Sequence, residues 1–262
     1  MDFEQRLQAM DLSLFDTIET QSMEGDRLAW LAIQRYVRRA GDYAYLEIGS
    51  FRGGSLQQHV ADPKCRRAYS IDPRPERSPD NRGKAMQYEG NTTEQMVKNL
   101  SRVPNAQLQR LTCFDTDASA LEPSRIAIPP NLCFIDGEHT TEAVLSDFRF
   151  CQSVARPDSV IVLHDDDIVT PAIRQLLRLL KLQRRPFRVR KFFGGSTFAF
   201  FFGVSKVRDP LIRRLSFDGI LWTRMRPVVA LGRQIVPSAL LPAATNLYTR
   251  AMKAPTVTRT DS

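Results

Sequence analysis

Residues 43–55 read YAYLEIGSFRGGS, and this stretch carries the strand–turn–helix signal that decides the fold. The apolar run at 43–49 predicts a buried strand that ends in glycine, and the glycines beyond it predict a tight turn into a helix. Glycines there let the backbone approach a ligand closely, and the helix that follows offers free N–H groups. The spacing differs from the GxGxxG of a dinucleotide loop, and Glu47 would repel a pyrophosphate, so a neutral or cationic ligand fits better.

The same alternation of short apolar runs and helical patterns continues on both sides of this turn. Further strands are predicted at 67–72, 107–112, 132–136 and 159–164, and a pair at 187–193 and 197–204 flanks Gly194-Gly195. Helices are predicted at 26–39, 55–61, 92–103, 141–155 and from Thr170 onward. This order predicts an α/β fold: a doubly wound, Rossmann-like, mostly parallel seven-stranded sheet that ends in a C-terminal antiparallel hairpin.

Three segments are expected from composition. Residues 1–40 form an N-terminal helical segment, residues 41–205 the ligand-binding domain, and residues 206–262 a basic, amphipathic extension that is mostly helical up to about residue 235. Residues 1–170 hold 19 Lys and Arg against 26 Asp and Glu, whereas residues 171–262 hold 18 against 3. The basic end is either a solvated face or a surface for an anionic partner, such as a membrane. For the extension itself, peripheral membrane contact, a homo-oligomer interface and a lid over the substrate are all open.

Composition excludes several classes of protein. With 262 residues, 42% hydrophobic and 25% charged residues, the chain is neither disordered nor fibrous. Its four cysteines show no CxxC spacing, so neither a disulfide scaffold nor a structural zinc site is expected. The N-terminus has no secretory pattern, and a cytoplasmic location is predicted, with the inner membrane surface as an alternative. An acidic body without an aromatic-basic strip disfavours nucleic acid as a partner.

Acidic residues stand where the predicted strands end. Asp72 ends the second strand, where a carboxylate can accept both hydroxyls of a ribose; the alternative is a simple turn before Pro73. Asp136 ends a later strand, and Asp165 and Asp166 end the next one. The carboxyl ends of parallel strands face one crevice, where three gathered carboxylates favour a hard divalent cation such as Mg²⁺. The alternative is that Asp165–Asp167 cap the helix that begins near Thr170.

These motifs together resemble the class I S-adenosylmethionine-dependent methyltransferases, specifically the metal-dependent O-methyltransferase branch of catechol-type and bacterial sugar and macrolide enzymes. The resemblance covers about residues 25–204. It implies that S-adenosylmethionine is the cofactor, bound by the turn, by the acid after the second strand and by acids after later strands. The corresponding positions here are Glu47, Gly49, Ser50, Gly53, Ser55, Asp72, Asp115 (or Asp117) and Asp136.

The same resemblance implies a metal site and a general base. Asp136, Asp165 and Asp166 would bind one Mg²⁺ or another hard divalent cation, and His139, three residues after Asp136, would be the base. His164 is expected to pack at the strand end or to support a metal ligand. The predicted function is metal-assisted methyl transfer to a hydroxyl of a small molecule or sugar. A cephalosporin-hydroxylase-like protein and a non-catalytic membrane-surface or scaffold protein with this fold are the alternatives.

Overall fold

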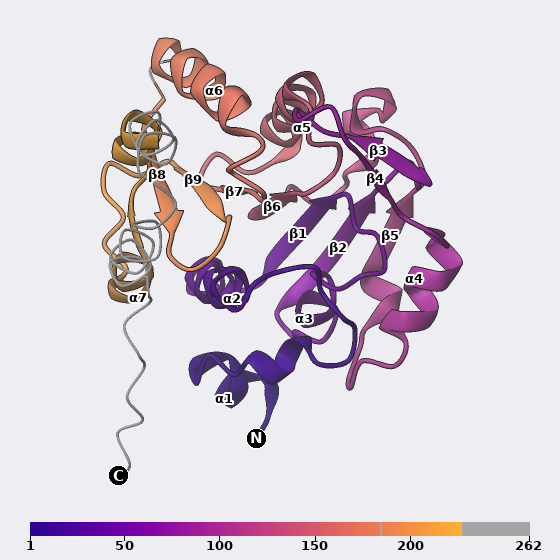
Figure 1. Ribbon diagram of the computed structural model, residues 1–262. Helices are drawn as coiled ribbons and strands as arrows, with labels where there is room; N and C mark the ends of the chain where they lie inside the picture. Colours follow the sequence, from indigo (N-terminus) through magenta and orange to yellow (C-terminus); the bar gives the residue numbers. More distant parts are fainter. Residues whose placement is uncertain (184, 227–262) are drawn as a thin grey trace, which may run out of the picture.

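The computed structural model describes residues 1–183 and 185–226, which form an eight-stranded sheet with helices on both faces (Figure 1). The strand order is β10-β8-β9-β7-β6-β1-β2-β5. Five strands are parallel: β1 (Tyr43–Ile48), β2 (Cys65–Ile71), β5 (Leu111–Phe114), β6 (Leu132–Ile135) and β7 (Val160–Leu163). The antiparallel strands are β8 (Phe187–Phe192), β9 (Phe198–Phe202) and β10 (Ser216–Asp218). The predicted fold class is confirmed.

Two separate hydrophobic cores lie on the two faces of this sheet. Alternation along β1 assigns Tyr45 to one core and Leu46 to the other, as expected for a strand buried on both faces. The first core is covered by α1 (Phe3–Gln8), the 3₁₀ turn η1 (Leu12–Phe15), α2 (Glu24–Arg38), α3 (Gln57–Val60), α4 (Thr93–Leu100) and α7 (Pro210–Leu215). The second core is covered by η3 (Ala118–Ala120), α5 (Thr141–Val154) and α6 (Thr170–Leu182), and the short turn η4 (Pro123–Arg125) contacts α5. The fold is therefore doubly wound.

Two elements differ from the sequence predictions at the β5 side of the sheet. The strand expected at 107–112 begins later, because Leu108–Arg110 form the short 3₁₀ turn η2 and β5 covers Leu111–Phe114. The stretch from Arg74 to Gly83, which has the polar and proline-rich composition of a loop, contains part of a hairpin of β3 (Arg77–Pro79) and β4 (Ala85–Gln87). The backbone N–H of Asn81 donates to the carbonyl of His139, so this hairpin is docked on the loop after β6.

The extension that begins at residue 206 contributes the eighth strand. After α7, the chain forms β10, which pairs with β8 at the sheet edge, and residues 219–226 are helical. The sequence predicted mostly helical structure here. A strand interrupts it, because Ser216–Asp218 form backbone hydrogen bonds with the otherwise unpaired edge of β8. Residues 227–262, on which the rest of the predicted amphipathic extension falls, lie outside the described residues. Among the helices of the described residues, none is long and apolar enough to span a bilayer.

Candidate active site

Parallel pairing in register brings the strand ends to one edge of the sheet. Ile48 of β1 pairs with Ile71 of β2 and with Ile135 of β6, and Ile135 in turn pairs with Leu163 of β7. The next residues along these strands are Gly49, Asp72, Asp136 and His164. The polar residues that stand out in the sequence therefore meet because their strands end level with one another.

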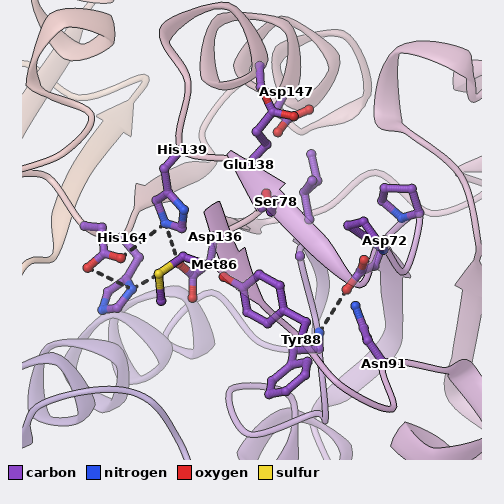
Figure 2. Close-up of a pocket in the computed structure, with 18 of the residues that line it drawn as sticks. Asp72, Ser78, Met86, Tyr88, Asn91, Asp136, Glu138, His139, Asp147 and His164 are labelled. Atoms are coloured by element: carbon purple, nitrogen blue, oxygen red, sulfur yellow. Dashed lines mark hydrogen bonds and ion pairs between the residues drawn. The ribbon is translucent and has the colours of Figure 1, made fainter. Parts of the chain in front are cut away.

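A cavity of about 630 Å³ opens at this edge (Figure 2). One part is lined by Gly49, Asp72 and Asp117, and another by Asp136 and His139. The hairpin of β3 and β4 and the residues that adjoin it cover the cavity with further side chains: Arg77, Ser78, Arg82, Met86 and Tyr88. This volume lies in the range of about 300–1,000 Å³ that is typical of small-molecule sites.

The glycine turn lies against the strand that carries Asp136. Gly49 has φ of +86°, and a Cβ on it would lie 2.4 Å from the backbone oxygen of Asp136. Further along the turn, Phe51 adopts φ of +43°, and its N–H donates to Asp72 Oδ2 over 2.9 Å. The backbone N–H of Arg74 donates to Asp72 Oδ1 over 2.8 Å. Arg74 Nη1 also donates to Asp72 Oδ2 over 3.3 Å, so the turn and Arg74 together fix this carboxylate at the wall of the cavity.

Four of the predicted cofactor residues in and beside the turn do not line this cavity. Glu47 is fully buried below the turn, where it accepts hydrogen bonds from Tyr45 Oη and Ser55 Oγ. Burial, together with the charges of Asp136 and Asp72, raises the pKa of Glu47 to about 8 despite these two donors. Ser50 is buried, and its hydroxyl makes no hydrogen bond. Gly53 lies against Leu100 and Met96 instead of the cavity.

The two aspartates after β5 differ in their position relative to the cavity. Asp115 accepts a hydrogen bond from Thr93 Oγ1, has a side chain that is 54% exposed, and does not line the cavity. Asp117, at the start of η3, lines it together with Ala118. Of the two positions that the resemblance suggested, Asp117 lines the cavity and Asp115 does not.

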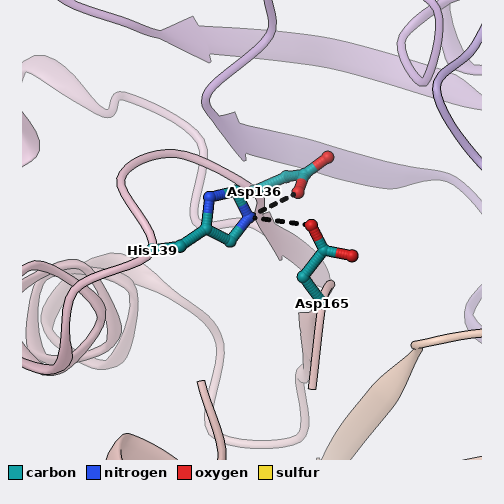
Figure 3. Close-up of side chains that lie close together, drawn as sticks. All are labelled: Asp136, His139 and Asp165. Carbon is teal, nitrogen blue, oxygen red and sulfur yellow. Dashed lines mark ion pairs between the residues drawn. The ribbon is translucent and has the colours of Figure 1, made fainter. Parts of the chain in front are cut away.

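Asp136, His139 and Asp165 converge at the β6–β7 side of the cavity (Figure 3). His139 Nε2 lies 3.5 Å from Asp136 Oδ1 and 3.2 Å from Asp165 Oδ2. On the other side of the cluster, His164 Nδ1 lies 3.0 Å from Asp136 Oδ1, and its Nε2 lies 3.5 Å from the buried Asp26 Oδ2. The site therefore alternates carboxylates and imidazoles.

The pKa values follow from this alternation. Burial lowers the pKa of His139, but its contacts with Asp136 and Asp165 outweigh burial and raise the pKa to about 9. Burial lowers the pKa of His164 as well, and Asp136 and Asp26 raise it well above the usual value. For Asp136 the balance is the reverse: burial raises its pKa, and the two histidines lower it to about 2. In the protein alone, both imidazoles are therefore protonated at neutral pH.

Asp166 does not join this cluster, contrary to the prediction that it is the third metal ligand. Its side chain is 2% exposed and accepts hydrogen bonds from Lys191 Nζ and Trp222 Nε1, each over 2.7 Å. Asp165, its neighbour, takes φ of +49° and contacts His139, so the two adjacent carboxylates point to different partners.

Asp136, His139 and Asp165 nevertheless fit a divalent cation. One donor atom from each lies within 4.8 Å of the other two, and His139 Nε2 is buried without a hydrogen bond of good geometry. The two carboxylates would balance a doubly charged ion and are the ligands that hard cations prefer, so Asp136 and Asp165 would hold the cation with an unprotonated His139 beside it.

Several lining residues could not be found from the sequence. Tyr88 and Asn91 follow the hairpin, whose composition suggested a loop, and Asp147 lies on α5 with a pKa that burial raises to about 7. Asp26 lies on a helix far away in sequence, and its part in the cluster depends on how α2 packs against the sheet. Only Asp147 had a signal in the sequence, because an aspartate on the apolar side of a predicted helix is unusual.

Comparison with known proteins assigns this fold. Residues 46–165 match the family model described as a methyltransferase domain. The crystal structure of cofactor-bound Rv0187 from MTB is 18% identical, with 78% of this chain and 91% of that chain covered and a TM-score of 0.51. For CalS11, a TDP-rhamnose 3′-O-methyltransferase of calicheamicin biosynthesis, identity is 16%, coverage 76% and 93%, and the TM-score 0.51.

At such identities these structures show the same fold and nothing finer. No curated protein sequence matches the chain. The family match begins within β1 and ends at Asp165, so it spans Gly49, Asp72, Asp136 and His139. Residues 46–165 are therefore a methyltransferase domain, and the predicted resemblance to the class I S-adenosylmethionine-dependent methyltransferases is confirmed.

Proposed function

We propose that the protein transfers a methyl group from S-adenosylmethionine to a hydroxyl of a small molecule in this cavity. The observation that carries the proposal is the position of His139, which lines the cavity with its Nε2 between Asp136 and Asp165, on the same sheet edge as Gly49 and Asp72. A donor held at Gly49 and Asp72 would thus lie in the same cavity as a base that can receive the hydroxyl proton.

The donor half of the cavity fits a nucleoside with a short polar chain. Gly49 leaves no side chain between the turn and the strand that carries Asp136, and Asp72 presents a fixed carboxylate for two vicinal hydroxyls. Asp117 lies on the same cavity and supplies an acceptor for an amino group. This half therefore offers contacts for the ribose and the base of the proposed cofactor.

The acceptor half supplies proton transfer. His139 would take the proton of the acceptor hydroxyl, and Asp136 and Asp165, which flank its Nε2, would stabilise the imidazolium that results, as its raised pKa indicates. The hydroxyl oxygen forms the new bond to the methyl carbon while the carbon–sulfur bond breaks, so the sulfonium leaves as a neutral thioether. A divalent cation held by Asp136 and Asp165 would oppose protonation of His139 and would acidify a nearby hydroxyl.

The walls of the cavity support a hydroxylated ring as the acceptor. Phe51 and Tyr88 meet edge to face, with ring centroids 5.1 Å apart, and supply an apolar shelf beside polar groups. Such a mixture suits a hydroxylated ring. The name of CalS11, a sugar O-methyltransferase, supports sugars as the first acceptors to be tested.

A direct assay tests the proposal. Purified protein is incubated with S-adenosylmethionine and a panel of hydroxylated acceptors, and mass spectrometry detects S-adenosylhomocysteine together with the mass gain of one methyl group on the acceptor. We expect turnover that falls at least about 100-fold in His139→Gln, which keeps a polar side chain but cannot take the proton. Parallel reactions with EDTA and with added Mg²⁺ or Mn²⁺ test the cation.

Each result separates two alternatives. Turnover that is unchanged in EDTA would remove the cation from the proposal. His139 would then act as base only in its unprotonated fraction, so turnover should rise with pH up to about pH 9. Unchanged turnover in His139→Gln would remove the base. Binding of S-adenosylmethionine without any methylated product would favour the non-catalytic alternative, and absence of binding by calorimetry would favour a protein of the hydroxylase-like kind.

A further inference from the structure

Helix 219–226 contacts the loop that carries two of the predicted metal ligands. Trp222 Nε1 donates to Asp166 Oδ2 over 2.7 Å, and Lys191 Nζ donates to Asp166 Oδ1 over the same distance. Lys191 Nζ also lies 5.7 Å from the centroid of the Trp222 ring. A carboxylate from the site loop is therefore held from two sides by residues beyond the matched domain.

The backbone of the same loop is held as well. Arg226 Nη1 donates to the carbonyl of Asp166 over 3.2 Å, and Nη2 donates to the carbonyl of Asp167 over 2.8 Å. The N–H of Asp166 donates to the carbonyl of Ser196 in the β8–β9 turn over 3.0 Å. The N–H, the carbonyl and both carboxylate oxygens of Asp166 thus all have hydrogen-bond partners.

This arrangement has a consequence for Asp165, its neighbour in the chain. Asp165 has φ of +49°, a conformation that residues other than glycine adopt at a cost and keep only when their surroundings impose it. Its Oδ2 faces His139 Nε2 at 3.2 Å, and its Oδ1 accepts a hydrogen bond from Ser196 Oγ over 3.1 Å. With Asp166 held on one side, Asp165 is directed to the other side, toward the cavity.

We infer that residues 216–226 complete the active site, with Trp222 and Arg226 as positioning residues that direct the Asp165 carboxylate toward His139. The inference rests on the proposed function for its effect on turnover, but its geometric part stands on the contacts alone. It also gives Asp166 a role in place of metal binding: its carboxylate connects the site loop to the C-terminal helix.

The alternative is that helix 219–226 only covers the core. Trp222 is 9% exposed and belongs to the second hydrophobic core, so its loss could act through packing alone. Trp222→Phe separates the two roles, because it keeps an aromatic ring and removes the N–H that donates to Asp166. Arg226→Gln is the second variant, since it tests the backbone contacts without opening the core.

Histidine signals in NMR provide a readout that needs no turnover. The chain has three histidines, of which His139 and His164 face Asp165, whereas His59 stacks on Tyr45 in the first core. At one fixed pH, we expect Trp222→Phe and Arg226→Gln to shift the ring signals of His139 and His164 and to leave His59 in place. Leu221→Ala, at a half-exposed position on the same helix, is the control and should shift none.

Kinetics then measure the effect on the site. We expect kcat to fall about tenfold in both variants, as displacement of a site group by a fraction of an ångström predicts, while the Kd for S-adenosylmethionine stays within about twofold, because Gly49 and Asp72 are untouched. If the signals of His139 and His164 stay in place in both variants, the inference is wrong, whatever the activity. If these signals shift but the wild-type protein shows no turnover, the positioning stands and the proposed function fails.

Discussion

His164 Nδ1 lies 3.0 Å from Asp136 Oδ1, and this contact joins the central carboxylate of the site to the buried interior. The other nitrogen of the same ring lies 3.5 Å from Asp26 Oδ2, and Asp26 in turn accepts hydrogen bonds from the N–H of Ser196 and from Thr197 Oγ1, each over 2.7 Å. A protonated His164 thus neutralises two carboxylates that would otherwise repel one another.

Replacement of this ring by an apolar one is expected to be costly. His164→Phe keeps an aromatic ring against Trp30 and Phe134 but leaves Asp26 and Asp136 without their shared cation. Breaking a buried ion pair by removing one partner typically costs about 3–5 kcal/mol, so we expect a loss in the free energy of unfolding of that order. Urea unfolding followed by circular dichroism measures it.

The double variant His164→Phe/Asp26→Asn provides the matching control. It removes one of the two unpaired charges while retaining hydrogen bonding to Ser196 and Thr197, so part of the lost stability should return. Equal stability of the single and double variants would show that the two carboxylates are not coupled through His164.

Asp72 and Asp115 form a natural pair for testing the cofactor site. Both follow neighbouring strands, but Asp72 lines the cavity and Asp115 does not. We expect Asp72→Asn to weaken the binding of S-adenosylmethionine by about tenfold or more, as loss of a hydrogen bond to a charged group predicts, and Asp115→Asn to change it less than about twofold. Isothermal titration calorimetry gives both constants, and a reversed order would place the ribose elsewhere.

The sequence predicted the sheet edge well, because strand ends are set by local pattern. The apolar runs before Gly49, Asp136 and His164 each end at a polar or glycine residue, and parallel pairing brings those ends level. The direction in which a side chain leaves the strand end depends on one backbone dihedral angle. Asp165 and Asp166 could not be distinguished for that reason, since only the φ of Asp165 separates them.

Contacts between distant segments were beyond prediction for a different reason. Trp222 and Asp166 are 56 positions apart, and neither is part of a local pattern that requires the other. Glu47 is the reverse case, a residue that the sequence placed in the site and the structure does not. Its place in the turn motif suggested a cofactor contact, but pairing of β1 with β2 and β6 buries it below the cavity. Burial of a polar side chain depends on the whole sheet.

Gly49 can be tested against a glycine that shares its strained backbone. Gly49 and Gly83 have φ of +86° and +72°, but a Cβ at Gly83 meets nothing within 4 Å, whereas at Gly49 it lies 2.4 Å from the backbone of Asp136. Gly83→Ala should therefore cost only the backbone strain of about 1–2 kcal/mol. Gly49→Ala should cost more and abolish S-adenosylmethionine binding, because the turn and the strand end must separate. Thermal unfolding and calorimetry on both variants test this, and equal losses would contradict it.

Glu47 predicts a pH dependence of stability whose sign can be worked out. Burial raises its pKa from 4.5 to about 8, so between those values the folded state binds a proton that the unfolded state has released. Stability therefore falls as pH rises through this window, by up to about 1.4 kcal/mol per pH unit from this group.

Glu47→Gln removes the titrating carboxyl and keeps a side chain that can hydrogen-bond Tyr45 and Ser55. We expect the stability of the variant relative to wild type to increase between about pH 5 and pH 8 in urea unfolding. Glu94→Gln, at an exposed position on α4, should follow the wild-type curve, and a Glu47→Gln curve parallel to the wild type would show that Glu47 is already ionised in the folded protein.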